Sequence, residues 1–117
     1  MEYIDLDVWR EARKLVKDLY LITNSFPQIE AYGLTTQMRR SVVSIPSNIA
    51  EGCGRRTSAE TIHFLHISRG SLYELETQTY LALDQEYIKE EESASILKQI
   101  ETNKKLLNGF INYYKNK

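Results

Sequence analysis

Apolar side chains recur at steps of three and four residues in four separate stretches of the chain, and this spacing constrains the fold more than any other feature. The stretches cover about residues 5–24, 34–52, 57–86 and 90–114. Such steps place the apolar residues on one face of an α-helix. In a chain of 117 residues we therefore expect one domain, residues 1–117, folded as an all-α, up-and-down, antiparallel four-helix bundle with loops of about 5–8 residues.

Pro46 lies inside the second stretch, and the helical spacing continues beyond it. A proline removes one backbone donor and clashes with the carbonyl group four residues earlier. The sequence therefore predicts a single helix with a kink at Pro46. We expect Asn48 and Glu51 to make polar contacts that fix the following turn, and Gly52 to lie where the helix ends.

The third stretch is the longest, and it begins with a capping signal. Thr57 and Glu60 have the spacing of a capping box, in which each side chain accepts a hydrogen bond from the other residue's backbone amide. Gly70 lies in the interior of this stretch, where glycine costs about 1 kcal/mol relative to alanine. We expect Gly70 to allow close approach of a neighbouring helix.

The composition narrows the setting in which the protein works. Cys53 is the single cysteine, so an internal disulfide is excluded and a reducing compartment is favoured. No apolar run approaches ~18 residues, and charged residues interrupt the first twenty, which argues against a membrane span or a secretory signal. We therefore expect a cytoplasmic protein that does not contact a membrane.

Residues that carry catalytic or metal chemistry do not form a recognisable set. Glu60 and His63 match the Glu-x-x-His spacing of metal sites in bundles, but such sites need a second copy, and His66 is the only other histidine. Cys53 has no histidine at a recognisable triad spacing. Neither a nucleophile elbow nor a phosphate-binding loop is present. We predict no enzyme activity, no metal, no cofactor and no small-molecule substrate.

Two arginine pairs, Arg39 with Arg40 and Arg55 with Arg56, are the local basic spots, and Glu51 lies between them. They are candidates for binding a nucleic acid or another partner, because arginine pairs well with phosphate groups. The other interpretation is that they are solvated or pair with carboxylates inside the protein. The net charge of −1 gives no general attraction to a polyanion, so we expect only weak nucleic-acid binding.

A second line of large side chains follows the third stretch at seven-residue steps: His66, Tyr73, Tyr80 and Tyr87, with Arg69 among them. This line lies about 100° around the helix from the residues expected in the core. It is either a widened core face or a subunit interface, where tyrosine and arginine are enriched.

Several sequence runs resemble the four-helix bundle proteins named for intervening sequences in bacterial 23S ribosomal RNA genes. They are YGL at residues 32–34, QMRR at 37–40, VSIPSNIAEG at 43–52, and the later runs at 64–65, 70–72 and 74–78. The resemblance implies homopentamers around a central channel and no catalytic residues. It also implies a relationship to the accessory variability proteins of diversity-generating retroelements, which are strongly basic and bind a reverse transcriptase and nucleic acid.

These observations favour a non-enzymatic, homo-oligomeric scaffold or adaptor whose main partner is itself. The alternative is an accessory factor for RNA or DNA that binds through the four arginines. The net charge of −1 differs from that of the strongly basic retroelement proteins and argues against this second function.

Overall fold

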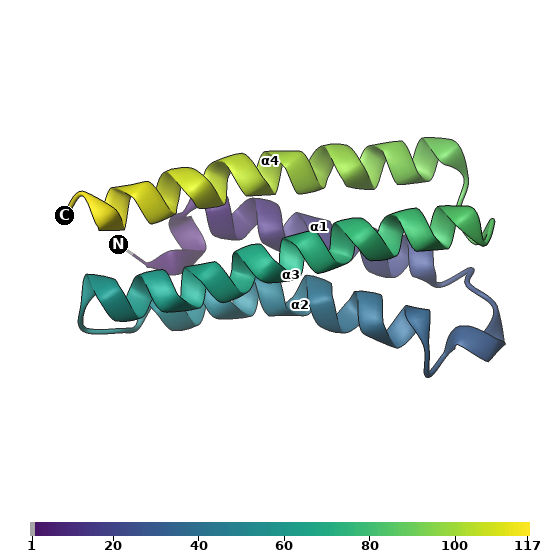
Figure 1. Ribbon diagram of the computed structural model, residues 1–117, viewed down its shortest axis with the longest axis horizontal. Helices are drawn as coiled ribbons and strands as arrows, with labels where there is room; N and C mark the ends of the chain where they lie inside the picture. The colour runs from purple at the N-terminus through teal and green to yellow at the C-terminus, as the bar shows by residue number, and fades with distance from the viewer. Residues whose placement is uncertain (1) are drawn as a thin grey trace.

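The computed structural model describes residues 2–117 and contains four long helices (Figure 1). They are α1 (Asp7–Thr23), α2 (Leu34–Cys53), α3 (Ser58–Asp84) and α4 (Glu90–Lys115). Short 3-10 turns, η1 (Tyr3–Asp5) and η2 (Gln28–Glu30), precede α1 and α2. The described residues form no strand, and successive helices run in opposite directions, as predicted.

The four helices pack in a ring, so each contacts the two that are next to it. α1 packs on α2 and α4, α3 packs on the same two helices, and the α2–α3 seam is the most extensive. The bundle measures 45 × 25 × 21 Å. Both chain ends and the α2–α3 turn lie at one end, whereas η2 and the α3–α4 turn lie at the other (Figure 1).

The buried residues of α3 follow the apolar spacing of its sequence, and Ser71 is buried beside that line. Thr61, Leu65, Ser68, Leu72, Leu75, Thr79 and Ala82 all lie in the core. In α1 the buried line passes through Val8, Leu15 and Leu19, while Trp9 and Val16 lie at its margin. The apolar spacing alone predicts a line through Trp9, Ala12, Val16 and Leu19, so the observed line is displaced slightly around the helix.

The prediction of which residues of α4 lie in the core is wrong at one position. The steps of four and three residues from Ile100 to Leu107 predict Lys104 in the core line, but Asn103 lies there instead and is only 2% exposed. Its Nδ2 donates to the carbonyl oxygen of Gln99 at 2.8 Å, which satisfies its donor inside the apolar interior. The core line of α4 therefore runs from Ile96 through Ile100 and Asn103 to Leu107.

Polar side chains join α3 to α2 around Pro46, which lies within one continuous helix. Ser68 Oγ donates to the carbonyl oxygen of Ile45 at 2.8 Å, and Ser71 Oγ donates to Ser44 Oγ at 2.9 Å. These serines are small and buried, so they allow the two helix backbones to lie close together while their hydroxyl groups remain hydrogen-bonded. A bend at Pro46 remains a prediction.

The end of α2 is packed directly against α3. A Cβ atom at Gly52 would lie 3.1 Å from the carbonyl oxygen of Thr61 and 3.3 Å from Phe64 Cβ, so the absence of a side chain permits the contact. The Oγ1 of Thr61 donates to the carbonyl oxygen of Gly52 at 2.8 Å. Contrary to the prediction, Asn48 does not contact the turn. Its side-chain amide instead donates to the carbonyl oxygen of Ser44 at 2.9 Å, one helical turn earlier.

The predicted cap of α3 forms in part. The backbone amide of Glu60 donates to Thr57 Oγ1 at 3.2 Å, as in a capping box. The Glu60 carboxylate accepts from the Thr57 hydroxyl at 3.0 Å rather than from the Thr57 backbone amide. The α1–α2 connection, residues 24–33, is longer than expected because it contains η2.

The far end of α3 closes with a left-handed residue. Glu86 has a φ of 61°, and the amide of Tyr87 donates to the carbonyl oxygen of Ala82 at 3.0 Å. The amide of Glu86 donates to the carbonyl oxygen of Leu83 at 2.9 Å. These two bonds form a Schellman motif in which a glutamate occupies the position that usually holds glycine.

Candidate interaction surfaces

The two arginine pairs lie towards opposite ends of α2. Arg39 and Arg40 lie in its second turn, and Arg55 and Arg56 follow Cys53, its last residue. The helix rise separates Arg39 from Arg55 by about 24 Å. The structure therefore does not gather the four predicted residues into one patch.

Arg39 links α2 to the C-terminal end of α1. Its Nε donates to Thr23 Oγ1 at 2.9 Å, and its Nη2 donates to Asn24 Oδ1 at 3.0 Å. Its guanidinium carbon lies 4.5 Å from the centre of the Tyr20 ring. A cation at this end of α1 also interacts favourably with the helix dipole. Much of the hydrogen-bonding capacity of Arg39 is thus used within the chain.

The other three arginines are exposed. Arg55 forms an ion pair with Glu51 at 3.3 Å, and its guanidinium carbon lies 4.5 Å from the centre of the Phe64 ring. Within residues 2–117, neither Arg40 nor Arg56 pairs with a carboxylate. These two side chains are the ones best placed to contact an external anion.

The outward face of α3 carries large apolar side chains. Tyr73 and Tyr80 are each 52% exposed, and Ile67 and Leu81 beside them are 40% and 48% exposed. His66 is exposed on the same face. We call these five residues the outer face of α3. Since the opposite side of α3 lies in the core, this helix has apolar residues on two sides.

Gly70 opens onto this outer face, and no helix of the described chain approaches it closely. No atom of the described chain, apart from its immediate helical surroundings, lies within 4 Å of where a Cβ atom would be. Gly70 lines a shallow hollow with Tyr73 and Thr77. The space beside Gly70 is therefore open to solvent or to another molecule.

Tyr87, the last member of the predicted line, does not belong to the outer face. It is half-buried, and its hydroxyl donates to Glu30 Oε2 at 2.8 Å. The other oxygen of Glu30 accepts from the backbone amide of Leu34 at 3.0 Å. These bonds, the one from Leu34 first, lower the pKa of the Glu30 carboxyl, and the bond to Glu30 raises the pKa of Tyr87. Tyr87 thus fixes the α1–α2 connection against the end of α3.

Arg69 has a contact that ties α3 to α4. Its Nη1 donates to Asn108 Oδ1 at 3.1 Å, and the side chain is half-buried. Arg69 lies between the outer face of α3 and α4 rather than at the centre of that face.

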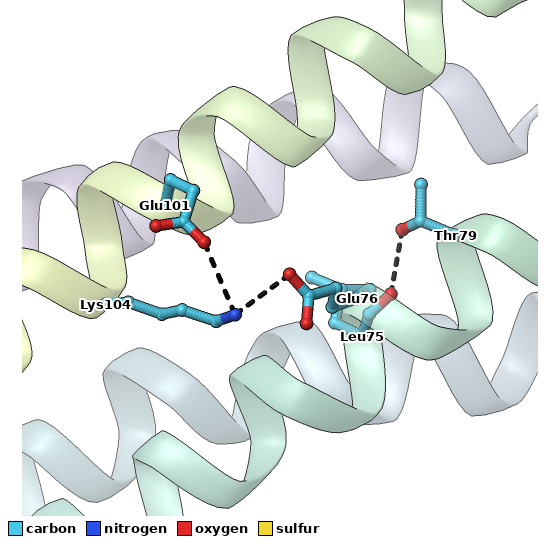
Figure 2. Close-up of polar contacts among 5 residues, drawn as sticks. All are labelled: Leu75, Glu76, Thr79, Glu101 and Lys104. Atoms are coloured by element: carbon cyan, nitrogen blue, oxygen red, sulfur yellow. Dashed lines mark hydrogen bonds and ion pairs between the residues drawn. The ribbon is translucent and has the colours of Figure 1, made fainter.

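Lys104 reaches from α4 into a cluster of groups on α3 and α4 (Figure 2). Its Nζ lies 2.8 Å from Glu76 Oε2 and 3.5 Å from Glu101 Oε1. The same ammonium lies 4.2 Å from the centre of the Tyr73 ring. The apolar spacing of α4 gave no indication that Lys104 would pair with Glu76.

The residues considered for metal binding or catalysis are Glu60, His63, His66 and Cys53. No group of three or more histidine, cysteine, aspartate or glutamate residues in the described chain is placed to hold a metal ion. Burial raises the pKa of the half-buried Cys53 thiol, which disfavours the reactive thiolate. Partial desolvation of the exposed His66 ring, followed by the charges of Arg69 and Lys115, lowers the pKa of His66.

None of the helices in residues 2–117 combines the length and the apolar character that crossing a bilayer requires.

The chain is similar to a protein of unknown function from the S23 ribosomal protein family of Bacteroides thetaiotaomicron VPI-5482, with a TM-score of 0.80 and 27% identity. That match covers 89% of this chain and 97% of the other chain. No curated protein matches the sequence. The relationship to retroelement accessory proteins remains a prediction.

The family model for the 23S rRNA-intervening sequence protein matches residues 4–109, which is most of the chain. The up-and-down bundle and the solved neighbour agree with this match. The chain therefore belongs to the family of 23S rRNA-intervening sequence proteins.

Proposed function

We propose that this protein is a non-enzymatic scaffold that works as an assembly of several copies of the bundle in the cytoplasm. The observation that carries the proposal is the outer face of α3. A helix at the surface of a small bundle ordinarily buries one side and presents charged residues on the other. α3 instead presents two tyrosines, an isoleucine and a leucine to solvent.

A second copy of the chain is the occupant that we assign to this face. The exposed side chains form a strip along α3, and Gly70 leaves an open space in its middle. Glycine in a helix interior costs about 1 kcal/mol relative to alanine, and its usual benefit is to let another backbone or a ligand approach closely. Nothing in the described chain approaches Gly70 in this way. Contact with another copy would cover the apolar strip and use the space beside Gly70. The family resemblance favours a closed ring of five copies.

The proposal is tested by the mass of the protein in solution, measured by light scattering on a sizing column at micromolar concentration. Gly70→Arg places a long charged side chain in the open space and improves the helix propensity of the residue by about 1 kcal/mol. We expect this variant to remain folded by circular dichroism but to dissociate. Tyr80→Glu, which adds a charge to the same face, is expected to have the same effect.

The matched control is Gly109→Arg on α4. Gly109 also lies in a helix interior, and no atom lies within 4 Å of its Cβ position in the described structure. This variant is expected to keep the mass of the natural assembly. A single-copy mass for the natural protein, or an intact assembly in Gly70→Arg, would refute the proposal. Equal dissociation of both arginine variants would also remove α3 as the interface.

Association with RNA or DNA is the second candidate function. It is supported by the exposed Arg40 and Arg56, which have no carboxylate partner in residues 2–117. The name of the family refers to 23S rRNA. We rank it second because Arg39 and Arg55 already make contacts within the chain, and Arg40 and Arg56 lie towards opposite ends of α2.

A further inference from the structure

A hollow at the end of the bundle that holds both chain ends is separate from the outer face of α3. Its volume is about 610 Å³, which lies within the range of about 300–1,000 Å³ usual for sites that bind small molecules. Four aromatic side chains line it: Tyr3 from η1, and Phe110, Tyr113 and Tyr114 from the last turns of α4. Gly109 lies on the same wall and leaves the hollow open on that side.

The aromatic rings on α4 form one cluster with several orientations. The Tyr114 ring lies edge-on to Phe110, at 5.1 Å between centres, and edge-on to Tyr113, at 5.2 Å. The rings of Phe110 and Tyr113 are nearly parallel. The cluster therefore offers ring faces in more than one direction. The face of an aromatic ring has a negative electrostatic potential, and sites that bind alkylammonium groups are commonly built from several such faces.

An ammonium group of the chain itself already lies over these rings. Lys117 Nζ is 5.2 Å from the centre of the Tyr114 ring and 5.4 Å from the centre of the Tyr113 ring. Both distances are within the range of cation–π attraction. The rings are thus placed where a cation can use them.

The residues that line the hollow carry a negative charge, which is opposite to the charge of an ammonium group. Among the described residues that line the hollow, Asp7 is the only one with a formal charge at neutral pH, since burial keeps the Cys53 thiol protonated. No basic side chain of residues 2–117 forms an ion pair with Asp7, whereas nearby Asp5 pairs with Arg10 at 3.6 Å. A carboxylate and aromatic rings that line the same hollow together favour an organic cation over an anion.

We propose that this hollow binds a small organic cation, with an alkylammonium group at the aromatic rings and the Asp7 carboxylate, and an apolar body in the remaining space. The proposal concerns a ligand site and does not depend on how the bundle assembles. The volume exceeds that of an ammonium head group alone, so an aromatic or branched aliphatic body belongs to the ligand.

The experiment compares choline with 3,3-dimethylbutanol, a neutral alcohol of the same shape, and adds benzyltrimethylammonium as the larger probe. Binding to the full chain is measured by calorimetry and by the chemical shifts of the aromatic side-chain protons. Fluorescence of Trp9, the single tryptophan, gives a third readout because its ring lies 5.4 Å from Tyr3. We expect choline to bind about tenfold more tightly than the alcohol, and benzyltrimethylammonium to bind more tightly than choline.

Two substitutions test the assignment of residues. Asp7→Asn and Tyr113→Leu are each expected to weaken choline binding by about three- to tenfold, with the fold verified by circular dichroism. The matched control Asp5→Asn removes a nearby carboxylate that does not line the hollow, and it is expected to leave the affinity unchanged. Equal binding of choline and the alcohol, or equal effects of Asp7→Asn and Asp5→Asn, would overturn the proposal. Benzyltrimethylammonium that binds less tightly than choline would also contradict it.

Discussion

Replacing Lys104 by methionine tests whether its ion pair holds α3 and α4 together. The Lys104 and Glu76 side chains are 11% and 26% exposed, and their charged atoms are 2.8 Å apart. An exposed pair contributes about 0.2–1 kcal/mol, and breaking a fully buried one costs about 3–5 kcal/mol. Because Glu76 is partly exposed, this pair lies between these two cases and nearer to the exposed one. We expect Lys104→Met to reduce the free energy of unfolding by about 1–2 kcal/mol.

The measurement is urea unfolding at one fixed protein concentration, since self-association makes apparent stability depend on concentration. Glu76→Gln and the double variant complete a mutant cycle, for which we expect a coupling free energy of about 1 kcal/mol. Lys105→Met, at the adjacent exposed position, is the control and is expected to change stability by less than about 0.5 kcal/mol. No loss in Lys104→Met, or a coupling free energy of zero, would refute the reasoning.

The same pair predicts a dependence on alkaline pH. Burial alone lowers the pKa of Lys104, but the hydrogen bond to Glu76 and the charges of Glu76 and Glu101 outweigh it and raise the pKa. The stabilisation is therefore fully present below the ordinary pKa of lysine and is lost as the pH rises through the higher pKa of the folded protein. Urea unfolding above the ordinary lysine pKa should show a smaller difference between the natural protein and Lys104→Met.

Three further outcomes follow from the structure. Glu86→Gly should raise the free energy of unfolding by about 0.5–1 kcal/mol in urea, because glycine adopts the left-handed conformation without strain; a lower value would contradict this. Gly52→Ala should lower it by about 1–3 kcal/mol, because the added Cβ meets the backbone of α3. Fluorescence titration with single-stranded RNA at physiological salt should give dissociation constants no tighter than ~10⁻⁴–10⁻⁶ M; submicromolar binding lost on Arg40→Ala would reverse our ranking of functions.

The bundle was predictable because the apolar spacing, the glycine at residue 52 and the cap at Thr57 all agree on where helices lie. The choice between Asn103 and Lys104 was not predictable. Both residues are polar and adjacent, so composition does not separate them, and only the rotation of α4 about its axis decides which one faces the core. Small changes in that rotation come from packing against α1 and α3, which a single stretch of sequence does not record.

The candidate surfaces were harder to predict from the sequence for a related reason. Arg39 reads as an exposed basic residue in the sequence, but α1 ends beside it and supplies Thr23 and Asn24 as acceptors. These partners come from a part of the chain that is distant in sequence, so no local pattern predicts them. The hollow at Asp7 was missed for the same reason, because η1 and the end of α4 meet only in the folded bundle.

α3 shows how spacing and polarity carry different information. At its core positions, Ser68 and Thr79 are polar but buried, because their hydroxyl groups bond to carbonyl oxygens of Ile45 and Leu75. On its outer face, Tyr80 is largely apolar but exposed. Spacing assigns Ser68 and Thr79 to the core, whereas polarity alone would place them at the surface. A polar residue at a core position therefore indicates a backbone hydrogen bond that compensates its burial, as at the α2–α3 seam. A contiguous patch of apolar residues outside the core positions favours an interaction surface, which is the reason that we propose a partner for the outer face of α3.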